Sequence, residues 1–263
     1  GCAGLNFAIT AAQRGHTVDV FEKSDRMGGK MHAAGAPLSK YELHNYMEWL
    51  FRQVEKQDGV TVHLNTTMTN QQLKEAGYDA VVFANGSKEG LPPIPGLKEN
   101  PNCIDSTGAL SLEKLPRTMV VIGGGVIGLE LACAYAAFGT KITVVEAMDH
   151  MLPMLDGDLT KIGVAHMKKM GMEFHLECPV QAVEASPVGA KVVCRDKSGK
   201  TVSFEAEKVL VAIGRKANTA GLDLAAGKIG NDKGRILVND RMQTNVPGVY
   251  AIGDCVFGHA QLA

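Results

Sequence analysis

Residues 118–146, TMVVIGGGVIGLELACAYAAFGTKITVVE, join a short apolar run, a glycine-rich turn, a helical stretch and a second apolar run that ends on an acid. Gly123, Gly125 and Gly128 have the spacing G-x-G-x-x-G, and Glu146 follows Gly128 by 18 residues. Strand, three glycines, helix, strand and terminal acid in this register predict a dinucleotide-binding unit, whereas the glycine spacing alone is a weak signal.

Each part of this unit has a physical task. The first glycine permits the tight turn from strand to helix, the second lets a pyrophosphate approach the backbone, and the third lets the helix pack close to its strand. Val126 and Ile127 open the helix, where free N–H groups and the helix dipole favour negative charge. Glu146 is placed to accept hydrogen bonds from both ribose hydroxyls of an adenosine. A 2′-phosphate would meet a carboxylate there, so the sequence predicts NAD rather than NADP.

The first residues of the chain repeat the same unit in part. Gly1-Cys2-Ala3-Gly4 corresponds to the end of a glycine turn, and Glu22 follows Gly4 by 18 residues, again after a small-residue helix and a short strand. The opening strand and the leading glycine of this copy would precede Gly1. We therefore expect two nucleotide-binding units, of which the printed sequence contains the second in full.

Composition narrows the functional class. The 263 residues carry a net charge of −1, 45% hydrophobic residues and 30 glycines, which suits an α/β protein with many tight turns. The absence of a basic block argues against nucleic acid and against electrostatic docking to a membrane. Six cysteines show no C-x-x-C pair, so we predict a reduced cytoplasmic protein. His150, His166 and His175 have no carboxylate or cysteine partners at metal-binding spacing, and we predict no metal site.

The sequence changes character at three places. We predict a first domain over residues 1–117 that ends in a proline-rich crossover linker at 88–117, an inserted domain over 118–215, and a return segment over 216–263 that completes the first domain. Both domains are expected to be α/β, with doubly wound, Rossmann-like parallel sheets.

This order resembles the flavoprotein superfamily with two dinucleotide domains, in which FAD occupies the outer domain and a nicotinamide nucleotide the inserted one. The crossover turns FANGS (83–87) and AIGRKANT (212–219) resemble those of the superfamily, with Asn85 in place of Thr and Ala217 in place of Pro. The resemblance implies that one set of residues holds NAD: Gly123, Gly125, Val126, Ile127, Gly128 and Glu146. It implies that a second set holds FAD or lines its crossover turns: Gly1, Gly4, Glu22, Lys23, Gly28, Gly29, Ala84, Gly86, Gly214, Gly253 and Asp254.

Two members of the superfamily are similar to different parts of the chain. The run from Met119 onward resembles dihydrolipoamide dehydrogenase, which carries a C-x-x-x-x-C redox pair soon after the Gly-Gly that follows the flavin acid. The corresponding run here, RMGGKMHAAGAPLSKYEL at 26–43, contains no cysteine, so a dithiol acceptor lacks its sulfur atoms. That run is instead similar to the flavin-reductase half of the enoate reductase and 2,4-dienoyl-CoA reductase group, in which an FMN barrel and an iron–sulfur cluster come first.

The functional prediction from the sequence is hydride transfer from NADH to FAD and on to a downstream centre. Two alternatives stay open: a dihydrolipoamide-dehydrogenase-like reductase, and a redox-silent nucleotide-binding remnant. No side-chain acid is obligatory for such a transfer, so no catalytic residue is assigned. Cys255 and His259, near the expected flavin end, are interpreted as packing residues. A chain that begins inside its first glycine turn is expected to be a piece of a larger protein, and to bind NADH through the inserted domain while holding FAD weakly or not at all.

Overall fold

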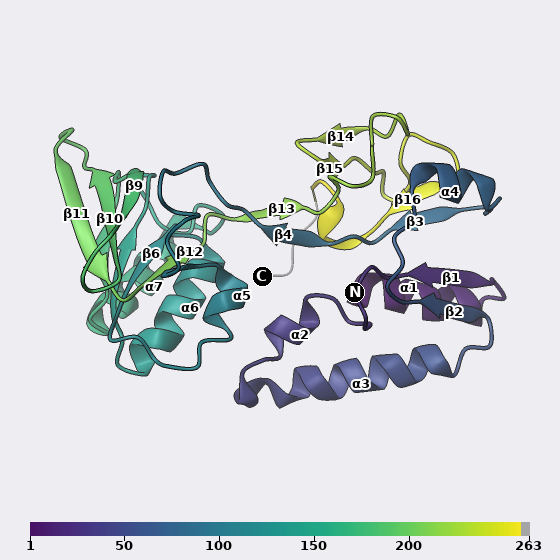
Figure 1. The fold of residues 1–263 in the computed structure, drawn as a ribbon, viewed down its shortest axis with the longest axis horizontal. Helices are drawn as coiled ribbons and strands as arrows, with labels where there is room; N and C mark the ends of the chain where they lie inside the picture. Colours follow the sequence, from purple (N-terminus) through teal and green to yellow (C-terminus); the bar gives the residue numbers. More distant parts are fainter. Residues whose placement is uncertain (259–263) are drawn as a thin grey trace. The chain divides into compact units, whose positions relative to one another are not determined.

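The computed structural model describes residues 1–258 and divides into two compact units (Figure 1). Within the described residues, the first unit contains 1–88 and 216–258, and the second contains 89–215. Two connecting strands, β4 (Ser87–Glu89) and β13 (Arg215–Ala217), pair with each other where the chain passes between the units.

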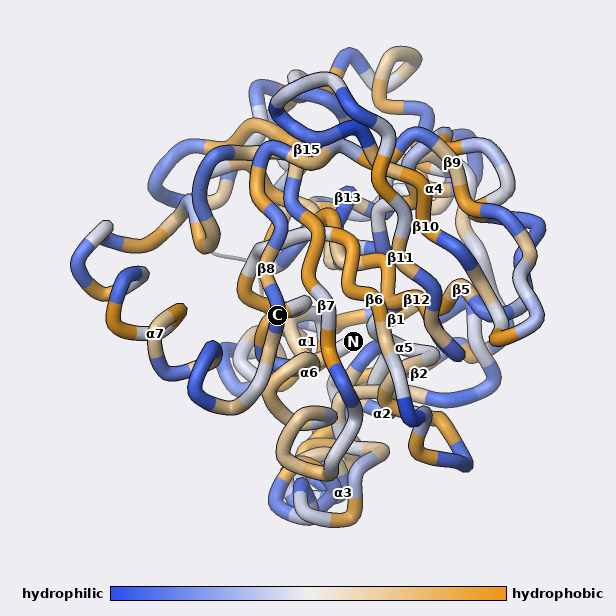
Figure 2. Tube along the Cα trace, turned by 90° about the vertical axis from the view of Figure 1, so that its left-hand side faces the viewer, coloured by the Kyte–Doolittle hydropathy of each residue, from blue (hydrophilic) through white to orange (hydrophobic). Residues whose placement is uncertain are grey.

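The second unit is built on a five-stranded parallel sheet with the order β5-β12-β6-β7-β8. Its central strands are apolar on both faces, as expected for a parallel sheet covered on both sides, and Figure 2 colours β6, β7 and β12 mostly as hydrophobic. The strands are β5 (Cys103–Ile104), β6 (Thr118–Ile122), β7 (Lys141–Val145), β8 (Glu173–His175) and β12 (Lys208–Val211).

Two different layers cover this sheet. Alternate residues of the strands face an apolar cluster formed with α5 (Ser106–Ala109), α6 (Val126–Ala137) and α7 (Gly157–Lys169). The other residues pack against an antiparallel meander of β9 (Val180–Ala185), β10 (Ala190–Arg195) and β11 (Thr201–Ala206). The expected Rossmann-like architecture is confirmed in this unit.

The predicted domain boundary at 117/118 falls inside the second unit. Strand β5 pairs with β12 in parallel, and Leu97 is 1% exposed within the core cluster of this unit. Because these contacts belong to the second sheet, the proline-rich segment packs as part of the second unit from Glu89 onward. A proline-rich composition indicated a linker, but it did not show which core the linker completes.

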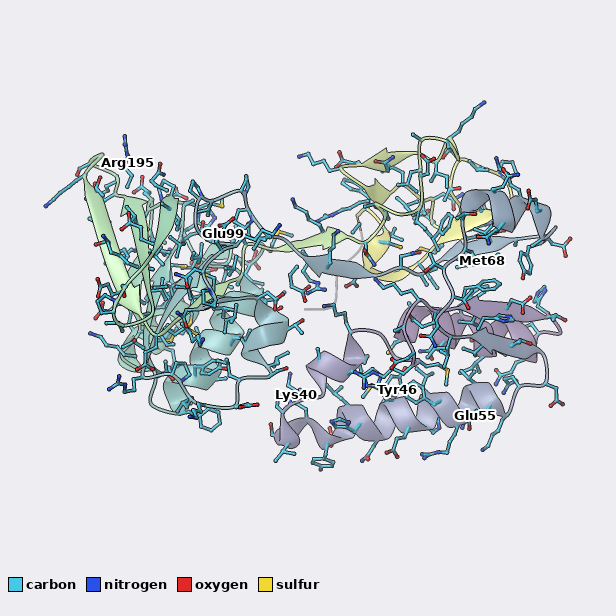
Figure 3. All side chains as sticks on the ribbon, viewed as in Figure 1. Lys40, Tyr46, Glu55, Met68, Glu99 and Arg195 are labelled. Atoms are coloured by element: carbon cyan, nitrogen blue, oxygen red, sulfur yellow. The ribbon has the colours of Figure 1, made fainter. Side chains whose placement is uncertain are left out.

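The first unit begins with α1 (Cys2–Gln13) and the parallel pair β1 (Val18–Phe21) and β2 (Val60–His63). Helix α3 (Tyr41–Glu55) packs on α1 through Leu50 and Val54, and its exposed side carries residues such as Glu55 (Figure 3). Met47, Leu50 and Val54 are buried and recur at the three- and four-residue spacing that places apolar side chains on one face of a helix.

A second parallel pair of strands in the first unit joins β3 (Val81–Phe83) and β16 (Val249–Ala251). The two pairs are separate two-stranded sheets, because no strand of the described residues lies between them. The remaining elements are short: α2 (Met31–Ala34), η1 (Leu38–Lys40), α4 (Asn70–Glu75), β14 (Asn231–Asp232), β15 (Arg235–Ile236) and η2 (Gly253–Cys255). His259 lies outside the described residues.

Candidate nucleotide-binding sites

The glycine turn of the second unit joins β6 to α6. Gly123 has φ +108°, and a Cβ atom on it would lie 2.5 Å from the carbonyl oxygen of Ala212, so both its backbone angle and its surroundings require glycine. A Cβ on Gly128 would lie 2.8 Å from the carbonyl oxygen of Gly123. The first and third glycines therefore serve the turn and the close packing of helix on strand.

Gly125 differs from its two neighbours in the motif. It is the N-cap residue of α6, its backbone is extended, and no side chain caps the helix there. No heavy atom lies within 4 Å of the position that its Cβ would take. An uncapped 12-residue helix thus begins beside open space, with Val126 39% exposed at its first position. Free N–H groups at such a terminus fit a pyrophosphate.

Glu146, at the end of β7, contacts the glycine turn directly. Its Oε2 accepts a hydrogen bond from the backbone N–H of Gly124 at 2.6 Å, and its Oε1 accepts one from Met148 N–H at 2.8 Å. The carboxylate is partly exposed, so lone pairs of both oxygens remain for ribose hydroxyls.

Gly124 is a site residue that the motif did not single out, because it occupies an x position of G-x-G-x-x-G. Besides its bond to Glu146, its carbonyl oxygen accepts from Leu152 N–H at 2.9 Å. A Cβ on Gly124 would overlap the sulfur of Met151. The sequence did contain one signal for Gly124, the uninterrupted run Gly123-Gly124-Gly125. The motif needs only the first and the third of these glycines.

The glycine turns of the first unit gather around the start of α1. Gly1 is the N-cap of that helix and has no side-chain cap. A Cβ on Gly29 would lie 3.1 Å from the Cα of Gly1, and a Cβ on Gly4 would lie 3.2 Å from that of Ala84. A Cβ on Gly253 would lie 3.1 Å from that of Ala3. Four separate segments, which contain Gly1 to Gly4, Gly29, Ala84 and Gly253, thus meet around the start of α1.

The acids expected at the FAD site are both held by serines. Glu22 Oε1 accepts from Ser24 N–H at 3.0 Å and from Ser24 Oγ at 2.8 Å, and Asp254 Oδ2 accepts from Ser87 Oγ at 2.7 Å. Burial raises the pKa of Glu22, but the hydrogen bonds from Ser24 and the nearby positive charges outweigh it and leave that pKa below its usual value. Lys23 is exposed beside it.

The other predicted FAD residues divide between the units. Gly28 and Gly86 belong to the first unit and have φ +107° and +67°, so both turns require glycine. Gly214 belongs to the second unit, where its carbonyl oxygen accepts from Gly90 N–H at 2.9 Å. That bond joins the two connecting segments. The assignment of Gly214 to the FAD site stays a prediction.

The cysteines of the described residues are poorly suited to thiolate chemistry. Cys255 is 0% exposed, and its Sγ donates to the carbonyl oxygen of Ile252 at 3.2 Å, in line with its interpretation as a packing residue. Burial raises the pKa of Cys103 to about 11 and that of Cys194 to about 12. Within residues 1–258, no group of three or more His, Cys, Asp or Glu side chains is arranged to hold a metal ion.

Two glycine turns, each followed by an acid at the end of the next strand, are the arrangement found in proteins that hold two nucleotides. The chain belongs to the pyridine nucleotide-disulphide oxidoreductase family, which it matches over residues 1–263. FAD and NAD(H), the cofactors expected from the sequence, are the cofactors of this family. The expectation of an FAD- and NAD(H)-dependent oxidoreductase is thereby confirmed at the level of the family.

Relatives of known name are mainly dihydrolipoyl dehydrogenases. Dihydrolipoyl dehydrogenase 1, mitochondrial, of Arabidopsis thaliana is 41% identical over 181 residues, which are 68% of this chain and 35% of that protein. Dihydrolipoyl dehydrogenase 3 of Pseudomonas putida is 32% identical over 306 residues, with 98% of this chain and 66% of that protein covered. The chain thus spans about a third of the Arabidopsis protein.

Solved structures show the same fold. The HOCl-induced flavoprotein disulfide reductase RclA of Escherichia coli is similar with a TM-score of 0.81 and 24% identity over 98% of this chain and 65% of that one. A 2-naphthoyl-CoA reductase is similar with a TM-score of 0.69 and 28% identity over 98% of this chain and 36% of that one.

None of the helices in residues 1–258 is both long enough and apolar enough to cross a membrane. The cytoplasmic location stays a prediction, because several relatives are named as mitochondrial proteins.

Proposed function

We propose that the chain is the nucleotide-binding part of an NADH-dependent FAD oxidoreductase whose second acceptor is not a dithiol of residues 26–43. The observation that carries this proposal is the absence of cysteine from residues 26–43. This run contains the Gly28–Gly29 turn and the helix α2 that follows it. When bound, NADH supplies a hydride that FAD accepts, and reducing a disulfide would then require a thiol pair beside the flavin.

The residues of the second unit fit a nicotinamide dinucleotide. The uncapped start of α6 provides free N–H groups, the open space at Gly125 admits a pyrophosphate, and Glu146 provides ribose acceptors. In the first unit, Gly1 and Gly29 offer a similar side-chain-free approach for the pyrophosphate of FAD, and Glu22 offers the equivalent acid.

The segment where the dithiol is missing is held by other contacts. His32, on α2, donates from Nε2 to the carbonyl oxygen of Met27 at 2.7 Å, and His44 on α3 donates to that of Gly35 at 2.6 Å. Met31 is 9% exposed. A packed methionine and two backbone-bonded histidines keep the segment in shape, and none of these groups undergoes the thiol–disulfide cycle.

The finer form of the proposal is a flavin reductase similar to that of the enoate and 2,4-dienoyl-CoA reductases, which would have a preceding FMN and iron–sulfur domain as its partner. The likeness to a 2-naphthoyl-CoA reductase supports this form for two reasons. The name of that protein gives a CoA ester as its substrate, and the region similar to this chain makes up only 36% of that protein, which leaves room for further domains.

A second candidate is a dihydrolipoamide-dehydrogenase-like reductase. Overall similarity favours it, since the relatives with 36–41% identity over about two thirds of the chain are mostly dihydrolipoyl dehydrogenases. This candidate requires a thiol pair from elsewhere, because residues 26–43 provide none. A redox-silent nucleotide-binding protein is the third possibility that the experiments below separate.

Spectroscopy of the full-length protein distinguishes these candidates. We expect bound flavin to be bleached by NADH, NADH-to-dye electron transfer to survive thiol alkylation, and lipoamide turnover to be absent. Lipoamide turnover that alkylation abolishes would replace the proposal by the second candidate. If NADH never bleaches the bound flavin, the protein is the third candidate, a redox-silent nucleotide-binding protein.

A further inference from the structure

Gly124 is fastened through both of its backbone polar groups to one loop, residues 146–152. Its N–H donates to Glu146 Oε2, and its carbonyl oxygen accepts from Leu152 N–H at 2.9 Å. Glu146 is itself tied back to the loop, because its Oε1 accepts from Met148 N–H. The glycine turn and this loop therefore form one closed set of hydrogen bonds.

Met151 occupies the centre of that set. It is 2% exposed and belongs to the apolar cluster between the sheet and its helices. Its sulfur fills the place where a side chain on Gly124 would stand. Met148 and Met154, in contrast, are 47% and 89% exposed, so the three methionines between β7 and α7 do not share one role.

The backbone indicates that the loop is held in this shape. Leu152 has φ +52°, a left-handed conformation that a leucine adopts at a cost of about 1–3 kcal/mol. That cost is offset by the Leu152 N–H bond to Gly124 and by the burial of the neighbouring Met151. The loop is thus built to contact the glycine turn, beyond linking β7 to α7.

We propose that Met151 is a positioning residue for nucleotide binding. By packing on Gly124, it fixes the turn that aims Gly125 and the free N–H groups of α6 at a pyrophosphate. This inference rests on the proposed function, because it assumes that the second unit binds NADH. Met151 is 2% exposed, so its effect on a nucleotide passes through Gly124. Glu146 keeps its bond from Met148 N–H when Gly124 shifts, so the ribose acceptor stays in place and the effect falls on the phosphates rather than on the adenosine.

The test compares three ligands on the full chain: NADH and ADP, which carry a pyrophosphate, and adenosine, which lacks it. We expect Met151→Ala to raise the Kd of NADH and of ADP by about tenfold and to leave that of adenosine within about twofold. Met151→Leu, which keeps an apolar side chain of similar volume, is expected to restore both affinities.

Two further variants separate positioning from general loss of packing. Met167→Ala truncates another methionine of the same cluster, 6% exposed and on α7, and should lower stability without changing any of the three Kd values. Gly124→Ala should raise the Kd of NADH by at least about tenfold, because the new methyl group would collide with Met151. The double variant Gly124→Ala with Met151→Ala should bind better than Gly124→Ala alone.

The outcomes are distinct. Met151 is only a packing residue if Met151→Ala leaves all three Kd values unchanged, as Met167→Ala should, or if it raises the Kd of adenosine as much as that of ADP. The inference is then wrong, while the proposed function stands. If Gly124→Ala is not improved by Met151→Ala, the coupling through Gly124 is likewise refuted. If the unaltered chain binds neither NADH nor ADP, the proposed function and the inference fall together.

Discussion

The backbone N–H of Gly124 and the carboxylate of Glu146 are joined by a 2.6 Å hydrogen bond. The acid at the end of β7 therefore contacts the glycine turn that follows the neighbouring strand β6. One carboxylate can fix the turn and also read the ribose, since each of its oxygens accepts more than one hydrogen bond.

This arrangement predicts a preference for NADH over NADPH. Residues 147–149, Ala-Met-Asp, offer no cation beside Glu146, so a 2′-phosphate meets one carboxylate directly and Asp149 nearby. We expect NADPH to bind at least about tenfold more weakly, a difference of about 1.4 kcal/mol. Titration of the chain with both nucleotides measures it.

Glu146→Gln should reduce the difference in affinity between NADH and NADPH, because the negative charge that repels the 2′-phosphate is gone. The amide oxygen can still accept from Gly124 N–H. Glu205→Gln on β11 is the matched control, since Glu205 is exposed and lies on the meander. Equal affinities of the unaltered chain for NADH and NADPH would contradict this assignment of Glu146.

Two glycines of the motif should fail in different ways. Gly123→Ala places a methyl group at φ +108° against the Ala212 carbonyl, and we expect it to destabilise the second unit by roughly 3 kcal/mol or more. Gly125→Ala meets no atom in the protein, so we expect at most about 1 kcal/mol of lost stability together with lost NADH binding.

Thermal unfolding and NADH titration of both variants check this contrast. A Gly125→Ala variant that is as unstable as Gly123→Ala, or that binds NADH normally, would show that the space beside Gly125 has another purpose.

Much of the second unit from Thr118 onward could be predicted from its sequence, because the elements around the glycine turn agree with their local signals. The apolar runs became buried strands, the three glycines became the turn, and Glu146 ended the second strand as its spacing required. Local pattern and tertiary packing coincide wherever a strand is buried on both faces.

The parts that could not be predicted depend on contacts between distant residues. The meeting of Gly29 with Gly1, or of Gly253 with Ala3, follows from the way the chain returns. Likewise, nothing in the run from Leu91 to Pro101 shows that Leu97 is buried in the second core. Gly124 was missed because its need for glycine arises from Met151, 27 positions further along the chain.

The thiols of Cys103 and Cys194 should be slow to alkylate in the folded protein. Burial raises the pKa of Cys103 to about 11 and that of Cys194 to about 12, so at about pH 8 only about one Cys103 thiol in a thousand is thiolate. Mass spectrometry after brief iodoacetamide treatment should find both unlabelled in native buffer and labelled in concentrated guanidinium. Rapid labelling of either one in native buffer would contradict the burial described here.

Glu22 should make the first unit sensitive to acid. Because its folded pKa lies below the unfolded value of 4.5, its contribution to stability is present above that value and is lost as pH falls through the folded pKa. Ser24→Ala removes the Oγ donor at 2.8 Å and should raise the Glu22 pKa toward its usual value. Carboxyl NMR titration of both proteins measures the change, and an unchanged Glu22 pKa in the variant would exclude Ser24 as its cause.

The last prediction concerns which residues the second unit needs in order to fold alone. A chain of residues 89–215 retains β5, the pairing of Val209 and Leu210 with that strand, and the buried Leu97. A chain of residues 118–215 loses all three and exposes the edge of β12. We expect the longer chain to unfold cooperatively and to bind NADH with the affinity of the 263-residue chain, and the shorter one to be destabilised by several kcal/mol, since removing Leu97 alone should cost about 2–5 kcal/mol. Circular dichroism melting and NADH titration of both fragments decide the matter. If residues 118–215 melt at the same temperature and bind NADH equally well, the segment before Thr118 is a linker after all, and its contacts with the second core contribute little to stability.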